Sequence, residues 1–536
     1  MKYDLVVIGG GIIGTGIARD AALRGLKVAL FEKNDFGSGT TSTSTRIIHG
    51  GLRYLEKLDF DLVYEALHER RRLLENAPHL VEPLPFLFPV YKKHGHALPV
   101  LWAGIGLYDI MNLRRGMPHH RFLPASHAVR LEPSLRKEGL HAGFLYYDAQ
   151  CEFPERLCIE NVIDAAANGA RLENHARVVG FLQSGAEVHG VRVRHDHDAK
   201  EEEVEASVVV NASGPWLDEV QGLQNEEAPG RLRRTKGIHL VVPRFNQHAL
   251  IMETRDAKRV FFAIPWGEYT LLGTTDTDYE GKNEDVAAND ADVQYLLQEL
   301  RSQLGVPLKE SDILFTTAGL RPLRRQVGRA TSDITRRHEF VDHERDEGLR
   351  GLVTVVGGKI TTFRNIAEEA VGLVFHKLGR RSPPSPTRAR PLPGGAAHDC
   401  AGFKKTFREE AAKARIANDL VERWLKLYGF RAKRVLQIIQ ADPAQGERFV
   451  PADPVVRAEV EMAVEEEFCG GLADFMLRRS MWGLRAGQGY RARDAVATAL
   501  GELLDWDEDR RQREIDDYVA ILVRMRSGAL TKKILA

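Results

Sequence analysis

Three glycines near the start of the chain have a spacing that suits the binding of a dinucleotide phosphate. Gly9, Gly11 and Gly14 form G-x-G-x-x-G directly after the apolar run at 4–8. In such a site the first glycine makes a tight turn, the second lets the backbone approach a pyrophosphate, and the third lets a helix pack against a strand. The free N–H groups at the start of that helix would face the phosphates.

The elements around these glycines support this interpretation. We expect a helix over 12–24 that ends at Gly25, followed by a strand over 27–31. Glu32 ends that strand, 18 positions after Gly14, where an acid that binds ribose is expected. Together these features predict a βαβ unit that binds FAD or NAD. A turn that binds nothing is the alternative, and the position of the acid argues against it.

A hydroxyl-rich stretch follows the second predicted strand. Residues 38–45 are rich in Ser and Thr, and His49, Gly50, Gly51 and Arg53 come next. A loop in this place can donate hydrogen bonds to a cofactor, and paired glycines let the backbone lie close to a flat ring. His49 and Arg53 would then lie beside that ring. The alternative is an ordinary hydroxyl-rich loop.

Two later strands also end in glycine turns. One predicted strand ends at Asn211-Ala212-Ser213-Gly214, and another at Gly357-Gly358-Lys359 before a helix that opens near Thr361. Turns at the carboxyl ends of such strands face the cofactor crevice. Lys359 would lie beside the polar edge of the cofactor ring, although an ordinary strand-to-helix turn needs no lysine there.

Composition limits the class of protein. The 536 residues predict two or three domains. Lys+Arg and Asp+Glu both number 75, so the net charge gives no reason to expect nucleic acid as a partner. Four cysteines without C-x-x-C spacing favour a reducing compartment and argue against a zinc site or a disulfide framework. We expect no signal peptide, and no run of 18 apolar residues is present to span a bilayer.

Further elements must position these residues. A helix is predicted over 61–77, with Arg70, Arg71 and Arg72 on its solvated face. Prolines 78, 83, 85 and 89 predict a loop and an edge strand. A strand meander is expected over 176–210. Short antiparallel strands are expected over 236–276, as a sheet over the cofactor with His239 at the head of one strand. Arg321 and Arg336 lie in the strands that follow.

The apolar stretch 98–111 has two interpretations. It contains Trp102 and Tyr108 and is too short to span a bilayer. The first interpretation is a buried helix. The second is a helix or loop that dips into one membrane leaflet, with the aromatic residues at the interface.

The C-terminal part is predicted to be almost entirely helical. A Pro/Gly/Ser-rich linker is expected over 380–397. Asp453-Pro454 has the pattern of a helix start, with Asp as the N-cap. We find no catalytic constellation in this sequence and expect an appendage for assembly or for covering the site.

Taken in order, these motifs resemble those of the flavin-dependent glycerol-3-phosphate dehydrogenases. The resemblance rests on IHGGLRYL, NASGPW, GTTD, GLRPL, GGKITTFR and PLPGG, and it covers essentially the whole chain. It implies an α/β fold with a Rossmann-like FAD-binding domain, an antiparallel substrate domain and an all-helical C-terminal domain. The implied boundaries are 1–388 for a discontinuous oxidoreductase unit (FAD-binding 1–90, 150–235 and 330–380; substrate cap 91–149 and 236–329) and 398–536 for the helical domain.

The same resemblance implies a set of site residues. FAD contacts are implied for Gly9, Gly11, Gly14, Glu32, Ser42, Ser44, His49, Gly50, Asn211, Gly214, Gly357, Gly358, Lys359 and Thr361. Substrate contacts are implied for Arg53, Tyr54, Arg321, Arg336 and Lys359. His49 is expected as the base, with His239 as the alternative, and Arg321 or Lys359 would stabilise the developing alkoxide. No metal is expected.

The resemblance further implies partners and a location. The substrate would be glycerol 3-phosphate and the electron acceptor a quinone, with 98–111 in contact with the cytoplasmic face of the inner membrane. A homodimer is left open. The sequence departs from the family pattern at Glu152-Phe153-Pro154, which affects the local interface and the acceptor rather than the chemistry. The rivals are a glycerol-3-phosphate oxidase that uses oxygen, an amine or amino-acid oxidase, and a flavoprotein without enzymatic activity.

Overall fold

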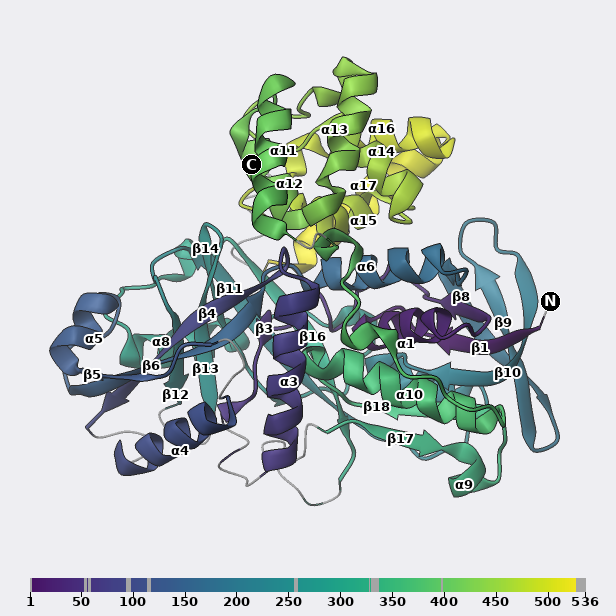
Figure 1. The fold of residues 1–536 in the computed structure, drawn as a ribbon, viewed down its shortest axis with the longest axis horizontal. Helices are drawn as coiled ribbons and strands as arrows, with labels where there is room; N and C mark the ends of the chain where they lie inside the picture. Colours follow the sequence, from purple (N-terminus) through teal and green to yellow (C-terminus); the bar gives the residue numbers. More distant parts are fainter. Residues whose placement is uncertain are drawn as a thin grey trace.

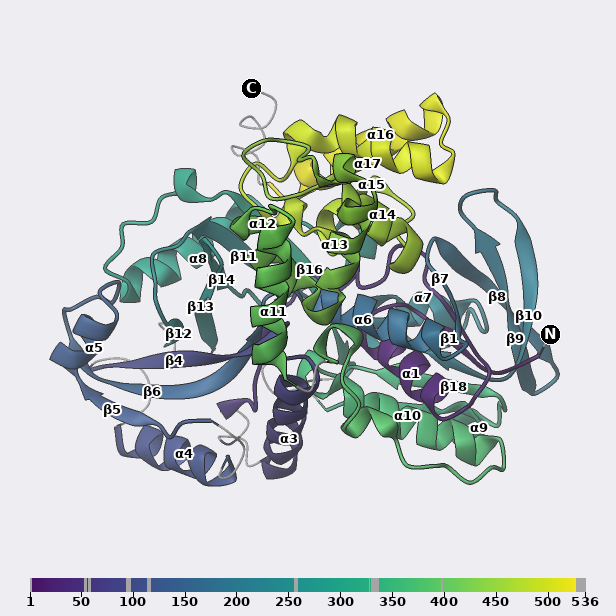
Figure 2. The same cartoon turned by 45° about the horizontal axis from the view of Figure 1, so that its top comes forward.

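A computed structural model describes residues 2–52, 55, 59–92, 98–112, 117–254, 259–326, 328, 337–396 and 399–526. Arg53, Tyr54 and Arg336 lie outside the described residues. The chain forms an eight-stranded sheet, a ten-stranded sheet and a group of C-terminal helices that lies across both (Figures 1 and 2). The predicted fold class is confirmed.

The eight-stranded sheet carries the predicted dinucleotide unit. Its strand order is β17-β18-β10-β1-β2-β7, with the β8–β9 hairpin attached to β10. The chain passes from β1 to β2 on one side and later adds β10 on the other, so the sheet has a topological switch point beside β1. Ile8 is in register with both Phe31 and Asn211, so the turns after these strands meet at one edge. The strands are β1 (Tyr3–Ile8), β2 (Val28–Phe31), β7 (Arg171–Glu173), β8 (Ala176–Ser184), β9 (Glu187–His195), β10 (Glu201–Asn211), β17 (Glu339–Asp342) and β18 (Leu352–Val356).

Helices cover this sheet closely. Helix α1 ends beside Gly25, whose φ of +82° is the left-handed conformation predicted for it. A Cβ at Gly16 in α1 would lie 2.9 Å from the ring of Phe363 in α10, so the glycine permits the two helices to approach. The helices of this part are α1 (Ile12–Leu23), α6 (Pro154–Ala167), α7 (Leu217–Gly222), α9 (His343–Glu347) and α10 (Phe363–Lys377).

The ten-stranded sheet forms the other half of the molecule (Figure 1). Its order is β15-β11-β14-β13-β12-β4-β6-β3, with β16 paired to β11 and β5 to β6. The predicted antiparallel strands of 236–276 are all present in it. The strands are β3 (Ile47–Ile48), β4 (Val81–Tyr91), β5 (Arg121–Pro124), β6 (Leu140–Cys151), β11 (Leu232–Pro243), β12 (Ala249–Glu253), β13 (Val260–Trp266), β14 (Tyr269–Gly273), β15 (Thr277–Asp278) and β16 (Phe315–Arg324).

The expectation of an edge strand near the prolines is wrong. Strand β4 lies inside the sheet, paired with β6 along its length and with β12 at Phe86 and Leu87. Pro83, Pro85 and Pro89 are separated by even numbers of residues, so their backbone nitrogens all face the same side of the strand. The missing N–H donors are therefore confined to that side. The donors on the other side remain available for β6. All but the last residue of strand β4 falls within 1–90, yet the strand belongs to this second sheet.

Helices on this half correct two further expectations. Helices α3 (Phe60–Asn76), α4 (Leu98–Met111), α5 (Ala125–Leu131) and α8 (Asp290–Gln303) pack around the sheet. Arg70 on α3 is fully buried rather than solvated, because its guanidinium is paired with Asp148 and bonded to Asn112. Helix α4 is not fully buried either, because Leu101, Ile105 and Tyr108 are its only buried residues. The expectation that Tyr108 lies at a membrane interface is therefore wrong, whereas Trp102 is exposed.

The C-terminal region is helical as predicted. Its helices are α11 (Cys400–Lys413), α12 (Asn418–Leu427), α13 (Ala432–Ala441), α14 (Arg457–Glu466), α15 (Leu472–Asp474), α16 (Arg493–Leu504) and α17 (Glu508–Arg524). Helix α14 begins at Arg457 and not at Asp453-Pro454. The Glu459 carboxylate accepts from the Val456 N–H at 3.1 Å, and this bond satisfies a donor at the start of the helix. None of the helices described here has the length and apolar character needed to cross a membrane.

Candidate active site

The glycine turn after β1 is tightly enclosed. Gly9 has a φ of +103°, and a Cβ there would lie 2.8 Å from the carbonyl oxygen of Ala212 in the turn after β10. A Cβ at Gly14 would lie 1.9 Å from the carbonyl oxygen of Gly9. A Cβ at Gly11, in contrast, would meet only the Thr41 hydroxyl, at 3.8 Å. The first and third glycines are therefore required by packing, and the second leaves room for a ligand.

Glu32 lies directly beside this turn. Its Oε2 accepts from the Gly10 N–H at 2.6 Å, and its Oε1 accepts from the Asn34 N–H at 2.8 Å. Burial raises the pKa of Glu32, and the two backbone bonds oppose that rise. A carboxylate has about four lone-pair positions, so Glu32 can also accept bonds from ribose hydroxyls.

The hydroxyl-rich stretch is held in place by Arg46, which was not predicted as a site residue. Arg46 is buried and bonds both carboxylate oxygens of Glu155, at 3.0 and 2.7 Å. It also donates to the carbonyls of Glu152 and Ser42. Its guanidinium stacks over the ring of Trp266. The unusual Glu152-Phe153-Pro154 segment therefore supports the cofactor loop, and Pro154 starts helix α6.

Two of the predicted hydroxyl contacts are already engaged within the loop. The Ser42 hydroxyl donates to the Gly37 carbonyl at 2.6 Å, and the Ser44 hydroxyl accepts from the Arg46 N–H at 3.4 Å. Thr40 donates to the Leu320 carbonyl at 2.7 Å, which links the loop to β16. The loop thus connects the two sheets.

The His49–Gly50 turn is fixed from two sides. The His49 N–H donates to the hydroxyl of Thr361, which lies just before α10, at 3.2 Å. The Gly50 N–H donates to the Tyr108 hydroxyl at 3.0 Å and to Asp148 at 3.3 Å. A Cβ at Gly50 would lie 2.5 Å from the Tyr108 oxygen, so Gly50 is required by contact with α4.

The glycine turns after β10 and β18 lie where the sequence predicted. The polar side chains of the two turns have different roles. The side-chain Oδ1 of Asn211 accepts from the N–H and hydroxyl of Ser213, so this side chain shapes its own turn. Gly214 has a φ of +56°. Gly357 and Gly358 have φ values of +71° and +111°, which favour glycine, and they bring Lys359 to the start of the turn before α10.

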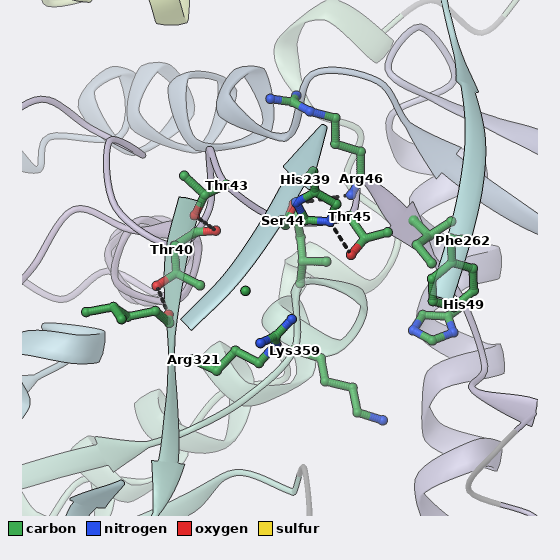
Figure 3. Close-up of a pocket in the computed structure, with 15 residues that line it drawn as sticks. Thr40, Thr43, Ser44, Thr45, Arg46, His49, His239, Phe262, Arg321 and Lys359 are labelled. Atoms are coloured by element: carbon green, nitrogen blue, oxygen red, sulfur yellow. Dashed lines mark hydrogen bonds between the residues drawn. The ribbon is translucent and has the colours of Figure 1, made fainter. Parts of the chain in front are cut away.

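One pocket gathers the predicted reactive side chains (Figure 3). Arg321, on β16, lies over Gly237 of β11, where a Cβ would come within 2.3 Å of the guanidinium. Arg321 donates to the Thr274 hydroxyl at 2.9 Å and pairs with Asp276 at 3.3 Å. The lining residues are Thr40, Thr43, Ser44, Thr45, Arg46, Ile47, His49, Gly237, His239, Phe262, Gly319, Leu320, Arg321, Lys359 and Ile360.

The two histidines in this pocket differ in their surroundings. His239 lies in the middle of β11, not at its head, with Thr45 3.0 Å from Nε2 and Thr317 3.5 Å from Nδ1. Burial, with Arg321 and Arg46 nearby, lowers the pKa of His239 to about 3. Burial lowers the pKa of His49 to about 4, with Lys359 and Arg70 adding to this effect and Asp148 opposing it. Both imidazoles are therefore neutral at neutral pH.

Within the described residues, one group of side chains has the spacing of metal ligands. Glu173, His195 and Glu202 have ligand atoms within 4.8 Å of one another, beside the turn between β9 and β10. Arg171 pairs with both carboxylates. Arg171 balances one of the two carboxylate charges and occupies oxygens of both, so the arrangement gives no support to a metal site.

Comparison with known proteins places the chain in a family. Residues 4–364 match the model described as FAD dependent oxidoreductase, and residues 385–511 match the C-terminal domain of alpha-glycerophosphate oxidase. A glycerol-3-phosphate dehydrogenase of Synechocystis sp. is 39% identical, covering 96% of this chain and 95% of its own. The chain belongs to the FAD-dependent glycerol-3-phosphate dehydrogenases. The mitochondrial member from Homo sapiens is 32% identical, over 99% of this chain and 75% of its own.

Solved structures agree with this family. A glycerol-3-phosphate dehydrogenase from Bacillus halodurans, complexed with FAD, superposes with a TM-score of 0.81 at 30% identity, covering 98% of this chain and 95% of the other. Glycine oxidase from Bacillus cereus shares the fold, with a TM-score of 0.51 at 20% identity over 71% of this chain and 96% of its own.

The described residues fit the FAD cofactor of this family. The enclosed turns at Gly9 and Gly14, the open side of Gly11 and the acceptor Glu32 suit the pyrophosphate and ribose. The His49–Gly50 turn, Lys359 and the hydroxyl stretch line the neighbouring pocket. Arg46 and Asp148 were not predicted as site residues, because nothing in their local sequence pattern distinguishes them from ordinary core or surface residues.

Proposed function

We propose that the chain oxidises sn-glycerol 3-phosphate to dihydroxyacetone phosphate and passes the electrons to a quinone. The observation that carries this proposal is the pocket in which Arg321 and Lys359 lie with two neutral histidines. The names of the relatives support this choice of substrate. An amine or amino-acid oxidase would need a carboxylate site with one or two arginines and would not need Lys359 as well.

The cations suit the phosphate of this substrate. Arg321 has a planar fork of donors that suits a phosphate, and its bonds to Thr274 and Asp276 fix its orientation in the pocket. Lys359 follows the glycine pair and contributes a second positive charge to the same pocket. Arg53, Tyr54 and Arg336 remain predicted substrate contacts.

His49 is the better candidate for the base. Bound FAD supplies an acceptor for the hydride that leaves C2, and a base must take the proton of the C2 hydroxyl. Hydroxyl groups adjoin both ring nitrogens of His239, whereas no hydrogen bond engages the His49 ring within the described part of the chain. We therefore assign proton removal to His49, with Arg321 or Lys359 stabilising the alkoxide.

Helix α4 is the proposed contact with the membrane and the quinone. Val100, Trp102 and Ile110 are exposed on its outer face, with relative exposures of 56%, 47% and 65%. Phe122 on the adjoining β5 is also exposed, and it lies beside Trp102. An apolar helical face with an aromatic residue suits insertion into one leaflet. We place this face at the cytoplasmic side of the inner membrane.

Sedimentation with lipid vesicles tests the membrane contact. Trp102→Glu should reduce the fraction of protein that sediments with vesicles. Leu223→Glu is the matched control, because Leu223 is also an exposed apolar residue but follows α7 on the other half of the molecule. Equal binding of wild type and Trp102→Glu would contradict a contact through α4.

Anaerobic titration of the flavin tests the reaction itself. Glycerol 3-phosphate should bleach the absorbance of bound FAD, and an absorbance that stays constant would contradict the proposal. Bleaching by sarcosine or an amino acid instead would favour the amine or amino-acid oxidase. Reoxidation that is faster with oxygen than with a soluble quinone would favour the glycerol-3-phosphate oxidase.

A further inference from the structure

The C-terminal helices contact the nucleotide-binding half through a buried group of charges. The carboxylate of Asp35 accepts two bonds from Arg479, at 2.5 and 2.9 Å, and one from Nε of Arg478. Asp35 and Arg479 are almost completely buried, and Arg478 nearly so. A paired interaction of this kind, removed from water, is specific in geometry and costly to break from one side.

The two arginines reach Asp35 from an unusual turn. Residues Phe475–Arg479 form a π-helical turn, in which the Ser480 N–H donates to the Phe475 carbonyl at 2.8 Å. Such turns are rare and are often found at functional sites. Arg479 also donates to the carbonyls of Glu467 and Phe468. These two bonds fix the orientation of the Arg479 guanidinium that binds Asp35.

Asp35 belongs to the loop that contains the ribose-binding acid. Only three positions separate it from Glu32, whose carboxylate is oriented by the N–H groups of Gly10 and Asn34. Phe36 packs under the glycine turn, since a Cβ at Gly10 would lie 2.6 Å from its ring. The ring of Phe36 also lies edge-on to that of Phe468, with centroids 6.0 Å apart.

A second link holds the same loop. The His175 N–H donates to the Asn34 carbonyl at 2.9 Å, and Nε2 of its ring lies 2.8 Å from Asp474. The Asn174 amide donates to Asp35 and to the Phe468 carbonyl, both at 2.9 Å. The loop over 32–36 is thus held from its back by segments on both sides of the interface.

We propose that the C-terminal helical region braces the cofactor-binding loop, with Asp35 as its anchor, and so strengthens the binding of FAD. Asp35, Arg478 and Arg479 are positioning residues, because they act through Glu32 and the glycine turn. A loop fixed in its binding conformation loses less conformational freedom when the cofactor binds. The inference concerns FAD and is independent of the substrate.

The affinity for FAD in two matched variants tests this proposal. Asp35→Asn removes the shared carboxylate charge and should raise the dissociation constant for FAD at least tenfold, as measured by the flavin fluorescence of deflavinated protein mixed with FAD. Asp164→Asn is the control. Asp164 is a buried carboxylate of α6 that pairs with Arg19 of α1 and with Arg390, and not with the 32–36 loop. It should leave the affinity unchanged.

The outcomes separate a brace from general destabilisation. Melting temperatures should fall in both variants, because each removes a buried carboxylate charge that two arginines share. Wild-type affinity in Asp35→Asn, or an equal loss of affinity in both variants, would overturn the proposal. If Asp35→Asn does not fold, Arg479→Lys keeps the charge but loses the bidentate contact, and it should show the same selective loss of FAD.

Discussion

At the scale of single residues, burial decides what the ionisable groups of the site can do. His49 and His239 are ordinary imidazoles in the sequence, and both become weak bases in the fold because charged forms are poorly solvated there. Arg70 was predicted to be solvated, but it is buried as a charged group because Asp148 balances its charge. The local pattern of charges does not reveal such partners.

The pH dependence of flavin reduction follows from His49. A base must be deprotonated, and a pKa lowered from 6.5 to about 4 keeps His49 deprotonated from pH 5.5 to 8. The limiting rate of anaerobic bleaching, measured at saturating glycerol 3-phosphate, should therefore show no midpoint near pH 6.5. His49→Gln should lower the limiting rate about 10²- to 10⁴-fold. A clear fall in the wild-type rate around pH 6.5 would argue against His49.

The phosphate contact of Arg321 predicts a change in affinity. Arg321→Ala removes a charged donor, which costs about 1.5–3 kcal/mol, so half-saturation should need about 10- to 150-fold more substrate. Arg324→Ala is the control: it changes the same strand three positions later, where the side chain is exposed and pairs with Glu339. An Arg321→Ala variant with wild-type half-saturation in the bleaching titration would remove this residue from the phosphate site.

At the scale of elements, helix α4 has two different faces. Its outer residues are exposed and apolar, and its inner residue Tyr108 donates to Asp148 at 2.8 and 2.9 Å while accepting from the Gly50 N–H. The apolar composition of 98–111 predicted a helix here, but only the partners of Tyr108 define which face turns inward. The element proposed to contact the membrane thus also supports the His49 turn.

Removal of the Tyr108 hydroxyl should slow flavin reduction. Tyr108→Phe leaves the ring in place but removes a support of the His49–Gly50 turn, and misplacement of the base should lower the limiting bleaching rate about 10- to 100-fold. Half-saturation should change little, because the cations that bind phosphate are untouched. Tyr146→Phe is the control, since this buried ring lies edge-on to Tyr108 and stacks on Phe86. Equal rates in the two variants would refute this role.

At the scale of the whole molecule, contacts between distant segments join the two sheets and the C-terminal helices. The ion pair between His175 and Asp474 joins segments about 300 positions apart, and Asp474 raises the pKa of His175 to about 9 against the desolvation by burial. The same pair lowers the pKa of Asp474. Both pKa shifts arise from the same ion pair, so its contribution to the free energy of unfolding is counted only once.

This pair predicts a loss of stability in alkaline solution. Because the folded pKa of His175 lies above 6.5, its contribution is fully present below pH 6.5 and is lost as the pH rises through about 9. The shift corresponds to about 3 kcal/mol. The melting temperature should therefore fall between pH 6.5 and 9.5, and less steeply in His175→Gln. Parallel curves for the two proteins would show that another group is responsible.

The sequence alone determined the nucleotide-binding unit, because its parts are local. Strand, glycines, helix, strand and Glu32 lie within consecutive residues, and backbone geometry restricts which residues can occupy the turn. The later turns at Gly214 and Gly357 were predictable for the same reason. Short apolar segments separated by turns likewise indicated most strands of the second sheet.

Only the tertiary structure decided which distant groups meet. The position of β4 inside its sheet, the pairing of Arg70 with Asp148, the support of the hydroxyl loop by Arg46 and the link from Asp35 to Arg479 all join segments far apart in the chain. Whether a charged group is buried or solvated depends on such partners. The protonation of His49 depends on its surroundings in the same way. Local periodicity carries no information about them, because the free energy of a buried charge is set by its surroundings in space.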